Sequence, residues 1–302
     1  MRIFRSLKPC ECDTAVALGY FDGIHIGHRA VIDAAVACKR EGLTPTVFTF
    51  AKTPKKGTER DQLLTYESKV EMLEKLGVEI LYIIDFELVR EKSPEEFVTE
   101  VLKGVFGAKK AFCGYNYHFG KNGAGTGETL RKLCEKHGID ATVKAPVSVD
   151  GELVSSTKIR GFLKSGDVKS AGKMLGYDYF LVSRSIEGNH IGSAIGTPTI
   201  NLTFRSDALL PKFGVYASIV TVGDKSFAGV TNIGVKPTVG EGNAPNCETW
   251  MPEYSGDSLY GKKVEVRLKE FIRPEKRFLN LSELEAAIKR DGETALGILS
   301  KN

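Results

Sequence analysis

Hydrophobic and polar positions follow different patterns in the two halves of the chain. In the first half, short apolar runs alternate with segments whose apolar residues recur at helical spacing. The predicted strands are residues 15–18, 44–50, 78–84, 110–113 and 139–145, and the predicted helices are residues 30–37, 66–76, a helix opening at 93–96 and one over about 128–137. Strands that alternate with helices predict a Rossmann-like, doubly wound parallel sheet.

Local signals support two of these helix starts. Thr65 stands where an N-cap is expected, directly before the periodic segment 66–76. Ser93-Pro94-Glu95-Glu96 predicts a capping box, with Pro94 at the first helical position. The stretch 51–64 between a strand and a helix is polar and carries Pro54 and Gly57, so we expect a mobile loop there.

The pattern changes after about Gly176. Short β-rich segments follow at 179–183, 215–222, 226–233 and 263–268, and only residues 281–291 have helical spacing, with Asn280 or Ser282 as cap. Short strands closed by one helix predict a small antiparallel β-barrel with a C-terminal helix. We therefore expect an α/β domain over residues 1–176 and a β domain over residues 177–302.

Composition narrows the class of protein. Of 302 residues, 42% are hydrophobic and 26% are charged, which is ordinary for a globular protein, and the net charge of +4 is too small to indicate a nucleic-acid partner. The first residues lack the apolar core of a signal peptide, and no apolar run reaches membrane-spanning length. None of the six cysteines forms a C-x-x-C pair, so we expect a reduced, cytoplasmic protein. A zinc site at Cys10 and Cys12 is the less favoured alternative.

The candidate chemistry of the first half lies at a turn between the strand 15–18 and the helix 30–37. Glycines there allow close approach to the backbone, and the N–H groups of a helix start attract anions. Two histidines at this turn could stabilise charge on a phosphoryl group; two surface histidines or a metal pair are the alternatives. The turn residues of interest are Gly19, Phe21, Asp22, Gly23, His25, Gly27 and His28.

Three further segments suit a nucleotide. One is the glycine-rich stretch 121–127, whose backbone amides could line a cleft, although a plain loop is equally possible. Asn116, in the segment 114–120 after a strand, could bond a phosphate or the shell of a metal ion, while its aromatic neighbours could stack on a flat ring or fill the core. Ser156 and Thr157 precede a predicted helix, and Arg160 offers a planar fork for phosphate. Hydroxyl groups at a helix start are equally often simple caps, so this segment alone does not indicate a phosphate site. Together with the histidine turn it becomes informative.

The motifs G-x-F-D-G-x-H-x-G-H and S-S-T-x-I-R together resemble the nucleotidyltransferase superfamily. With the rest of the chain they resemble the bacterial bifunctional riboflavin kinase/FAD synthetase family, in the expected order and over nearly the whole length. The resemblance implies that the first half transfers AMP from ATP to FMN, giving FAD and pyrophosphate. It also implies that His25 and His28 hold the phosphates and stabilise the transition state, with Ser156, Thr157 and Arg160 opposite them.

The second half resembles the kinase part of the same family. The motif P-T-x-N carries the resemblance, within the residues Gly196, Pro198, Thr199 and Asn201. The resemblance implies ATP as co-substrate at Gly196 and Pro198, Mg²⁺ held by Thr199 and Asn201, and Glu248 as the base that accepts the proton of the riboflavin 5′-hydroxyl. The substrates and products would be riboflavin, FMN, FAD, ATP, ADP and pyrophosphate.

Some positions differ from the family pattern. The usual T-F-x-P-H-P reads Thr49-Phe50-Ala51-Lys52-Thr53-Pro54, without histidine, and Leu63-Leu64-Thr65 lacks the preceding arginine. Trp250 stands where a histidine is common. Two alternative functions stay open: a class I aminoacyl-tRNA synthetase-like adenylyltransferase, because H-I-G-H occurs in those enzymes, and a non-catalytic flavin-binding regulator.

Overall fold

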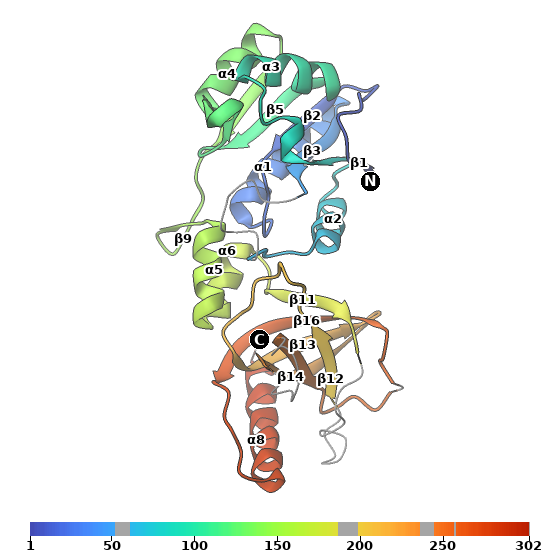
Figure 1. Cartoon of the computed structure of the whole chain (residues 1–302), viewed down its shortest axis with the longest axis vertical. Coiled ribbons are helices and arrows are strands. Elements are labelled where there is room, and N and C mark those ends of the chain that lie inside the picture. The colour runs from blue at the N-terminus through green and yellow to red at the C-terminus, as the bar shows by residue number, and fades with distance from the viewer. Residues whose placement is uncertain (52–60, 187–198, 236–244, 257, 302) are drawn as a thin grey trace. The chain divides into compact units, whose positions relative to one another are not determined.

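The computed structural model describes residues 1–51, 61–186, 199–235, 245–256 and 258–301. The chain divides into two compact units, Met1–Ser156 and Thr157–Asn302. Figure 1 shows an α/β unit and a β-rich unit, which are described separately below.

The first unit is built on a parallel sheet of six strands in the order β1-β4-β3-β2-β5-β8. Strands β2 and β5 are neighbours at the centre of the sheet. From β2 the chain continues to β3 on one side, and from β5 it continues to β8 on the other side, so a topological switch point lies between β2 and β5. The strands are β1 (Arg2–Phe4), β2 (Thr14–Leu18), β3 (Thr44–Phe50), β4 (Ile80–Ile84), β5 (Ala108–Gly114) and β8 (Asp140–Lys144).

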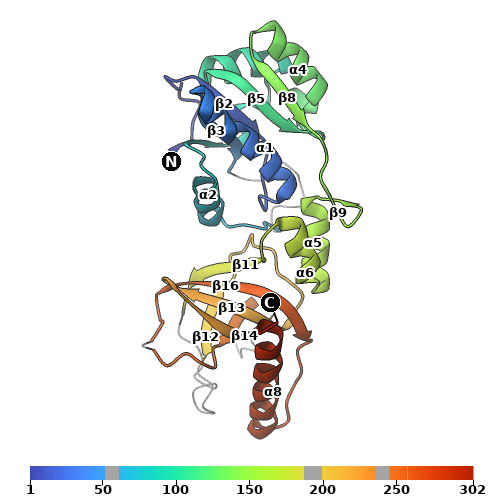
Figure 2. The ribbon, with the colours of Figure 1, turned by 180° about the vertical axis from the view of Figure 1, so that it is seen from behind.

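Helices cover both faces of this sheet, as predicted. Successive side chains of a strand point to opposite faces. Val16 and Leu18 of β2 belong to a buried cluster with Phe97 and Leu130, which come from the helical segments on one face. Helix α1 contacts β2, β3 and β5 and lies on the face seen in Figure 2. The helical segments are α1 (Ile26–Ala37), η1 (Cys38–Glu41), α2 (Tyr66–Lys75), η2 (Phe86–Leu88), α3 (Pro94–Glu96), η3 (Phe97–Val105), η4 (Lys121–Gly123) and α4 (Gly127–Lys136).

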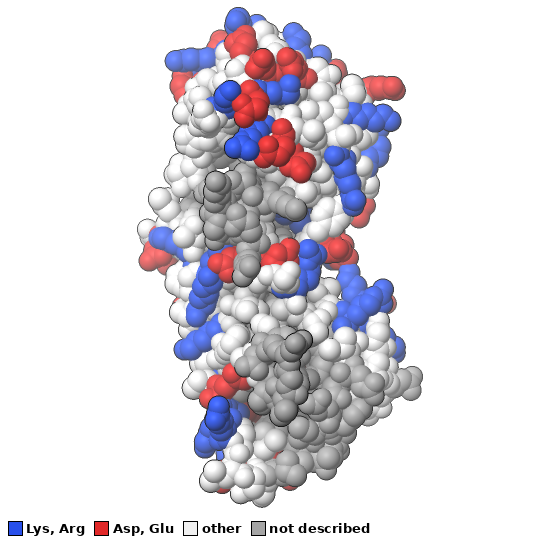
Figure 3. Space-filling view, viewed as in Figure 1, with Lys and Arg blue, Asp and Glu red and all other residues white. Residues whose placement is uncertain are grey.

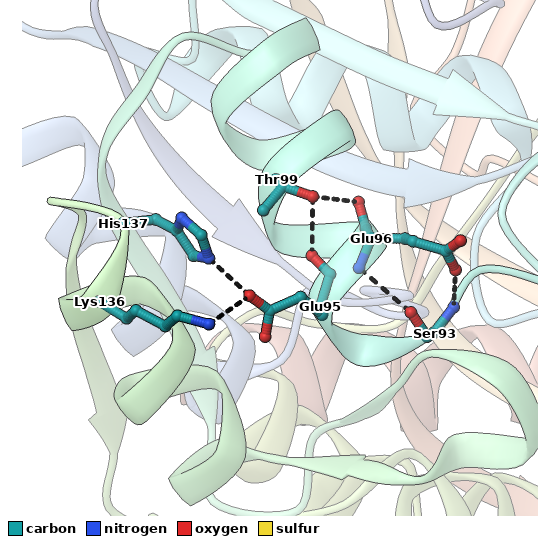
Figure 4. A network of polar contacts seen from close by, with 6 residues as sticks. All are labelled: Ser93, Glu95, Glu96, Thr99, Lys136 and His137. Atoms are coloured by element: carbon teal, nitrogen blue, oxygen red, sulfur yellow. Dashed lines mark hydrogen bonds and ion pairs between the residues drawn. The ribbon is translucent and has the colours of Figure 1, made fainter.

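The two predicted helix starts are confirmed. Thr65 accepts a hydrogen bond from the Ser68 N–H at 3.0 Å. Ser93 Oγ accepts from the Glu96 N–H at 3.2 Å, and the Glu96 carboxylate accepts from the Ser93 N–H at 2.7 Å. Figure 4 shows this capping box beside Glu95, whose carboxylate reaches Lys136 and His137 of α4 and its C-cap and so ties two helices together.

The helix that opens at Ser93 continues as a π-helix over Phe97–Val105. The Phe106 N–H donates to the Val101 carbonyl at 2.9 Å, five residues back. The sequence signals a helix start here, but they do not predict a π-helix, which is rare and appears mostly as single turns within α-helices.

Three short features of the first unit lie outside the prediction. β1 has only three residues and pairs with β4 at the edge of the sheet. Two small antiparallel pairs, β6 (His118–Phe119) with β7 (Gly125–Thr126) and β9 (Ser148–Val149) with β10 (Glu152–Leu153), are too short to give a periodic signal.

Leu63 and Leu64 are buried, so the end of the stretch predicted as a mobile loop packs into the unit.

The second unit contains an antiparallel sheet in the order β11-β16-β13-β14-β15-β12. An isolated bridge between Ile186 and Asn201 joins the region after β11 to β12, so the sheet closes on itself almost completely, as predicted for a barrel. Its strands are β11 (Phe180–Arg184), β12 (Thr199–Thr203), β13 (Gly214–Val222), β14 (Lys225–Val235), β15 (Pro245–Trp250) and β16 (Lys263–Arg273).

Helices α5 (Ser156–Ser165) and α6 (Val168–Leu175) precede the barrel, and α8 (Leu281–Leu299) follows it. Asn280 is the N-cap of α8, but the helix extends eight residues beyond the predicted end at Asp291. A Cβ at Gly292 would lie 2.7 Å from the Trp250 ring, so this glycine permits close packing and does not end the helix. Asp291 also forms a bidentate ion pair with Arg273 of β16, with an Nη2–Oδ2 distance of 2.7 Å.

A row of hydroxyl groups crosses three strands inside the barrel. Thr231 lies between Ser218, at 2.7 Å, and Thr249, at 2.9 Å, and all three side chains are fully buried. Thr231→Val removes the central hydroxyl and leaves two buried hydroxyls short of a partner, so we expect a loss of about 1–3 kcal/mol in unfolding free energy.

Urea unfolding followed by the fluorescence of Trp250, which is the single tryptophan of the chain, measures this loss. Thr221→Val is the matched control, because Thr221 bonds Ser226 on the exposed part of the same sheet. Equal midpoints for the two variants would show that the buried row contributes nothing to the barrel.

Charges are mixed on the surface. On the face seen in Figure 3, basic and acidic side chains are interspersed over the described residues of both units. This distribution agrees with the small net charge of +4. Within the described residues, the helices are too short or too polar for any of them to pass through a bilayer.

Candidate active sites

The histidine turn follows β2 at the switch point of the parallel sheet. It begins with Gly19, whose N–H donates to the Phe48 carbonyl of β3 at 3.2 Å. Two residues other than glycine, Phe21 (φ +53°) and Ile24 (φ +36°), adopt left-handed backbone conformations there. Such conformations cost on the order of 1–3 kcal/mol each and persist where the surroundings enforce them, which is common at functional sites.

His25 has a double role in this turn. It is the N-cap of α1, and its Nδ1 accepts the His28 N–H at 3.1 Å. Since Nδ1 is an acceptor, the neutral imidazole carries its proton on Nε2. Burial lowers the pKa of His25 to about 4, so the ring is neutral at pH 7. The cap therefore leaves His25 with an Nε2–H donor at the positive end of the α1 dipole.

His28 stacks on His25 with ring centroids 3.5 Å apart, and the Phe21 ring meets it edge-on at 5.4 Å. Part of His28 is exposed, but its Nδ1 is buried and has no hydrogen-bond partner among the described residues. Burial, and then the neighbouring His25 and Lys69, hold the pKa of His28 well below its usual range. A buried polar atom without a partner costs about 1–3 kcal/mol and needs an explanation, such as a missing ligand.

The glycines of the turn make room for these rings. A Cβ at Gly19 would lie 2.8 Å from the Phe21 ring, and a Cβ at Gly27 would lie 3.3 Å from the His25 ring. Gly23 has a φ of +84°, which glycine adopts without strain. All three glycines of the motif therefore have a steric reason to be glycine, besides any approach of a phosphate.

Asp22 links the turn to two distant segments. Its side chain is buried, and Oδ1 accepts the Leu63 N–H at 3.0 Å. Its carbonyl accepts the Ser156 hydroxyl at 3.0 Å. The structure thus brings Ser156 against the histidine turn, as the paired motifs suggest. The Asp22 carboxylate points to the backbone of Leu63, and its part in phosphate binding stays a prediction.

The remaining residues predicted for the nucleotide site are less closely defined. Asn116 is exposed in the turn after β5, whose carboxyl end adjoins that of β2 in the sheet. Thr157 is exposed and Arg160 half-buried on α5, and both belong to the second compact unit. Their roles stay predictions. Gly196 and Pro198 lie outside the described residues.

Sequence reasoning missed Lys69. It lies on the buried side of α2, with 6% of its surface exposed, and its Nζ donates to the Tyr20 carbonyl at 2.9 Å. A lysine four residues before Leu73, within the apolar stripe of a helix, is the signal that could have identified it.

A second group of polar residues lies on three neighbouring strands of the barrel. Asn201 of β12 is directly opposite Glu248 of β15, and Asn232 of β14 is opposite Glu248 on the other side. Thr199 is two residues before Asn201, so both side chains point to the same face of the sheet.

Asn246 completes this group and was not predicted. Its amide donates to Asn201 Oδ1 at 3.2 Å and to Glu248 Oε1 at 3.1 Å. Its place two residues before Glu248 is a usable signal, because the strand period puts both on one face. Thr199, Asn201 and Glu248 supply hydroxyl, amide and carboxylate oxygens, which are the donors that Mg²⁺ prefers. Within the described residues, no group of three His, Cys, Asp or Glu side chains is placed to hold a metal.

The buried histidines give a prediction for stability. A folded-state pKa of about 4 for His25, against 6.5 in the unfolded chain, means that the unfolded state binds more protons between these values. Stability therefore falls as the pH decreases through this window, by about 2 kcal/mol from His25 alone between pH 7 and pH 5.

Urea unfolding of the first unit, followed by circular dichroism or by hydrogen exchange of α1 peptides, measures the effect. His25→Asn is the matched variant, because asparagine is a good N-cap and does not titrate. The pH dependence should weaken in this variant, while the Trp250 transition of the barrel stays the same. An unaltered pH dependence would show that His25 is not buried as the neutral form.

Comparison with known proteins assigns both halves. The FAD synthetase family model matches residues 7–158, and the riboflavin kinase family model matches residues 175–299. Two such domains in one chain define an enzyme with a nucleotide-dependent synthetase domain and a flavin kinase domain.

Curated relatives match over nearly the full length. A relative from Bacillus subtilis is 34% identical, with 97% of this chain and 95% of the relative covered, and one from Escherichia coli K12 is 31% identical, with 93% and 91% covered. Both are named bifunctional riboflavin kinase/FMN adenylyltransferase. The chain belongs to this family, which confirms the resemblance of its motifs.

A solved structure is also similar over the whole chain. It is from Streptococcus pneumoniae and has a TM-score of 0.86 and 29% identity, with 97% of each chain covered. That protein is named a macrolide-efflux protein. The matched region includes both the α/β part and the barrel part.

Proposed function

We propose that the histidine turn is the site at which AMP is transferred, and that the Asn201–Glu248 group is the site at which riboflavin is phosphorylated. The protein is a riboflavin kinase and FMN adenylyltransferase, with ATP as co-substrate of both reactions. The family models and the curated relatives do not favour the synthetase-like and the non-catalytic alternatives. The proposal concerns which residues carry out each of the two reactions.

In the adenylyl transfer, an oxygen of the FMN phosphate attacks the α-phosphorus of ATP. A phosphorus–oxygen bond forms between the two nucleotides, the bond between the α- and β-phosphates breaks, and pyrophosphate leaves. The FMN phosphate is already ionised near neutral pH, so no general base is needed. Catalysis then depends on positioning and on stabilising charge at the phosphates.

The observation that carries this assignment is the tautomer set by the α1 cap. With Nδ1 accepting the His28 N–H, His25 directs a fixed Nε2–H away from the helix. The first-turn amides of α1 have no intrahelical acceptors and add positive potential at the same place. His28, stacked on His25, is the second donor. Gly19, Phe21, Gly23 and Gly27 shape the turn, and Asn116, Ser156, Thr157 and Arg160 would bind further phosphate oxygens.

In the kinase reaction, Glu248 accepts the proton of the riboflavin 5′-hydroxyl as that oxygen attacks the γ-phosphorus of ATP. FMN and ADP are the products. The Asn246 amide, 3.1 Å from Glu248 Oε1, orients the carboxylate for this task. A positioned base of this kind contributes roughly 10²–10⁴-fold to the rate.

Mg²⁺ fits the donor set of the barrel site. Thr199 and Asn201 would hold it through their side-chain oxygens, and the ion would neutralise charge on the ATP phosphates when bound. Gly196 and Pro198, on the segment before Thr199, would contact the nucleotide.

We further propose functional domains over residues 1–176 and 177–302. The first family model ends at residue 158 and the second begins at residue 175, so most of α5 and α6 lies between the two matches. The compact units divide earlier, after Ser156, and group these two helices with the second unit. All six cysteines are free thiols, which supports a reducing cytoplasmic setting.

The test is to incubate the purified protein with riboflavin, ATP and Mg²⁺ and to separate the flavins by chromatography. FMN should appear first and FAD should follow from it. Unchanged riboflavin would contradict the proposed function, and FMN without FAD would contradict the assignment of the histidine turn.

A further inference from the structure

The Lys69 ammonium occupies an unusual place for a lysine. It lies 2.9 Å from the Tyr20 carbonyl oxygen and 4.4 Å from the centre of the Tyr20 ring, and only 6% of the residue is exposed. Burial lowers the pKa of Lys69 to about 8, against the opposing effect of Asp22. Burying an ammonium group costs free energy unless its bonds are specific, so its position calls for a reason.

The Tyr20 carbonyl is held from two elements. The Thr49 hydroxyl at the end of β3 donates to it at 2.7 Å, and Lys69 of α2 donates to it as well. The Tyr20 hydroxyl bonds the Gln62 side chain. This carbonyl is part of the peptide bond between Tyr20 and Phe21. The two donors therefore fix the orientation of the peptide plane that precedes the left-handed residue Phe21.

Phe21 carries this constraint to the catalytic ring. Its φ is +53°, and its ring meets the His28 imidazole edge-on at 5.4 Å. A rotation of the Tyr20–Phe21 peptide would move the Phe21 ring and remove this contact from His28. The charged or titratable groups near His28 are His25 on the turn and Lys69 on α2, with Asp22 close to Lys69.

We propose that Lys69 is a positioning residue of the adenylyl-transfer site, which holds the Tyr20 carbonyl and thereby places the Phe21 ring and the His28 imidazole. This inference rests on the proposed function of the histidine turn. Lys69 acts through Tyr20 and Phe21, and it does not contact the reacting phosphates.

Lys69→Met tests the proposal, because methionine has a similar length and lacks the charge and the donors. We expect the kcat of FAD formation to fall at least about tenfold, with a smaller change in the KM for ATP, since His28 acts mainly on the transition state. The imidazole signals of His28 in ¹⁵N-histidine-labelled protein should shift, and its pKa should rise when the neighbouring positive charge is removed. Lys75→Met, at an exposed position of the same helix, is the control and should leave both measurements unchanged.

A second variant covers the case in which Lys69→Met does not fold. Thr49→Val removes the other donor to the same carbonyl, and it should shift the His28 signals and lower the kcat of FAD formation about threefold or more. Lys69→Arg keeps a charged donor and should recover part of the lost rate.

The outcomes separate this proposal from the proposed function. Wild-type protein that makes no FAD would refute the function of the turn, while the His28 signals would still decide the placement role. Normal FAD turnover in a folded Lys69→Met variant would overturn the proposal, as would a slow variant with unmoved His28 signals, because Lys69 would then act on substrate directly. Riboflavin phosphorylation should stay at the wild-type rate throughout.

Discussion

Replacing His28 with alanine should abolish FAD formation from FMN and ATP and leave the conversion of riboflavin to FMN intact. The imidazole lies at the start of α1, stacked on His25 with ring centroids 3.5 Å apart, in the turn that follows β2 at the switch point of the parallel sheet. Removing one preorganised donor from a site of this kind costs on the order of 10²–10³ in rate. His28 also supports the His25 ring by stacking, so the loss should reach the upper end of this range or exceed it.

The measurement uses each substrate separately. FMN with ATP reports on the adenylyl transfer alone, and riboflavin with ATP reports on the kinase through the appearance of FMN. His137→Ala is a suitable control, because His137 is a partly buried histidine of the same unit whose side chain contacts Glu95 (Figure 4).

The variant should be folded before its rates are interpreted. The His28 backbone N–H, which His25 Nδ1 accepts, remains in alanine, so the cap of α1 is preserved. A folded His28→Ala protein in which both activities fall together would contradict the assignment of the two reactions to separate sites. Retained FAD formation would remove His28 from the chemistry altogether.

The fold was largely predictable because its signals are local. Strands β2, β3 and β4 of the parallel sheet are buried runs, and Ser93, Pro94 and Glu96 form a capped helix start that depends on neighbouring residues alone. The C-terminal helix shows the limit of such reasoning. The helical spacing predicts an end at Asp291, yet Gly292 lies within α8, where a Cβ would come 2.7 Å from the Trp250 ring. Whether a helix continues past a glycine depends on tertiary contacts, and the local sequence pattern carries no information on those contacts.

The candidate sites were predictable where a motif carries them and not where partners come from distant segments. The histidine turn and the P-T-x-N strand have recognisable spacing. Lys69 and Asn246 have only a weak positional signal, the apolar stripe of a helix in one case and the strand period in the other. Each acquires its role from a group brought close by the fold, the Tyr20 carbonyl for Lys69 and Asn201 for Asn246. The Asp22–Ser156 contact joins residues 134 positions apart, and only the topology of the sheet places them together.

Replacing Glu248 with glutamine or alanine should have the opposite effect to the His28 variant. FMN synthesis from riboflavin should fall by roughly 10²–10⁴-fold, because the 5′-hydroxyl is a poor nucleophile without an acceptor for its proton. Added FMN should still be converted to FAD at the wild-type rate. Glutamine is the sharper change, since its amide oxygen can still accept the Asn246 hydrogen bond that Glu248 Oε1 accepts at 3.1 Å.

The control is Glu253→Gln, which changes an exposed glutamate shortly after β15 and should leave both activities unaltered. Kinase turnover that survives in folded Glu248→Gln and Glu248→Ala proteins would exclude Glu248 as the base. In that case Asn201 and Thr199 would still supply the oxygen donors of the barrel site, and its chemistry would consist of positioning and charge neutralisation alone, as proposed for the adenylyl transfer.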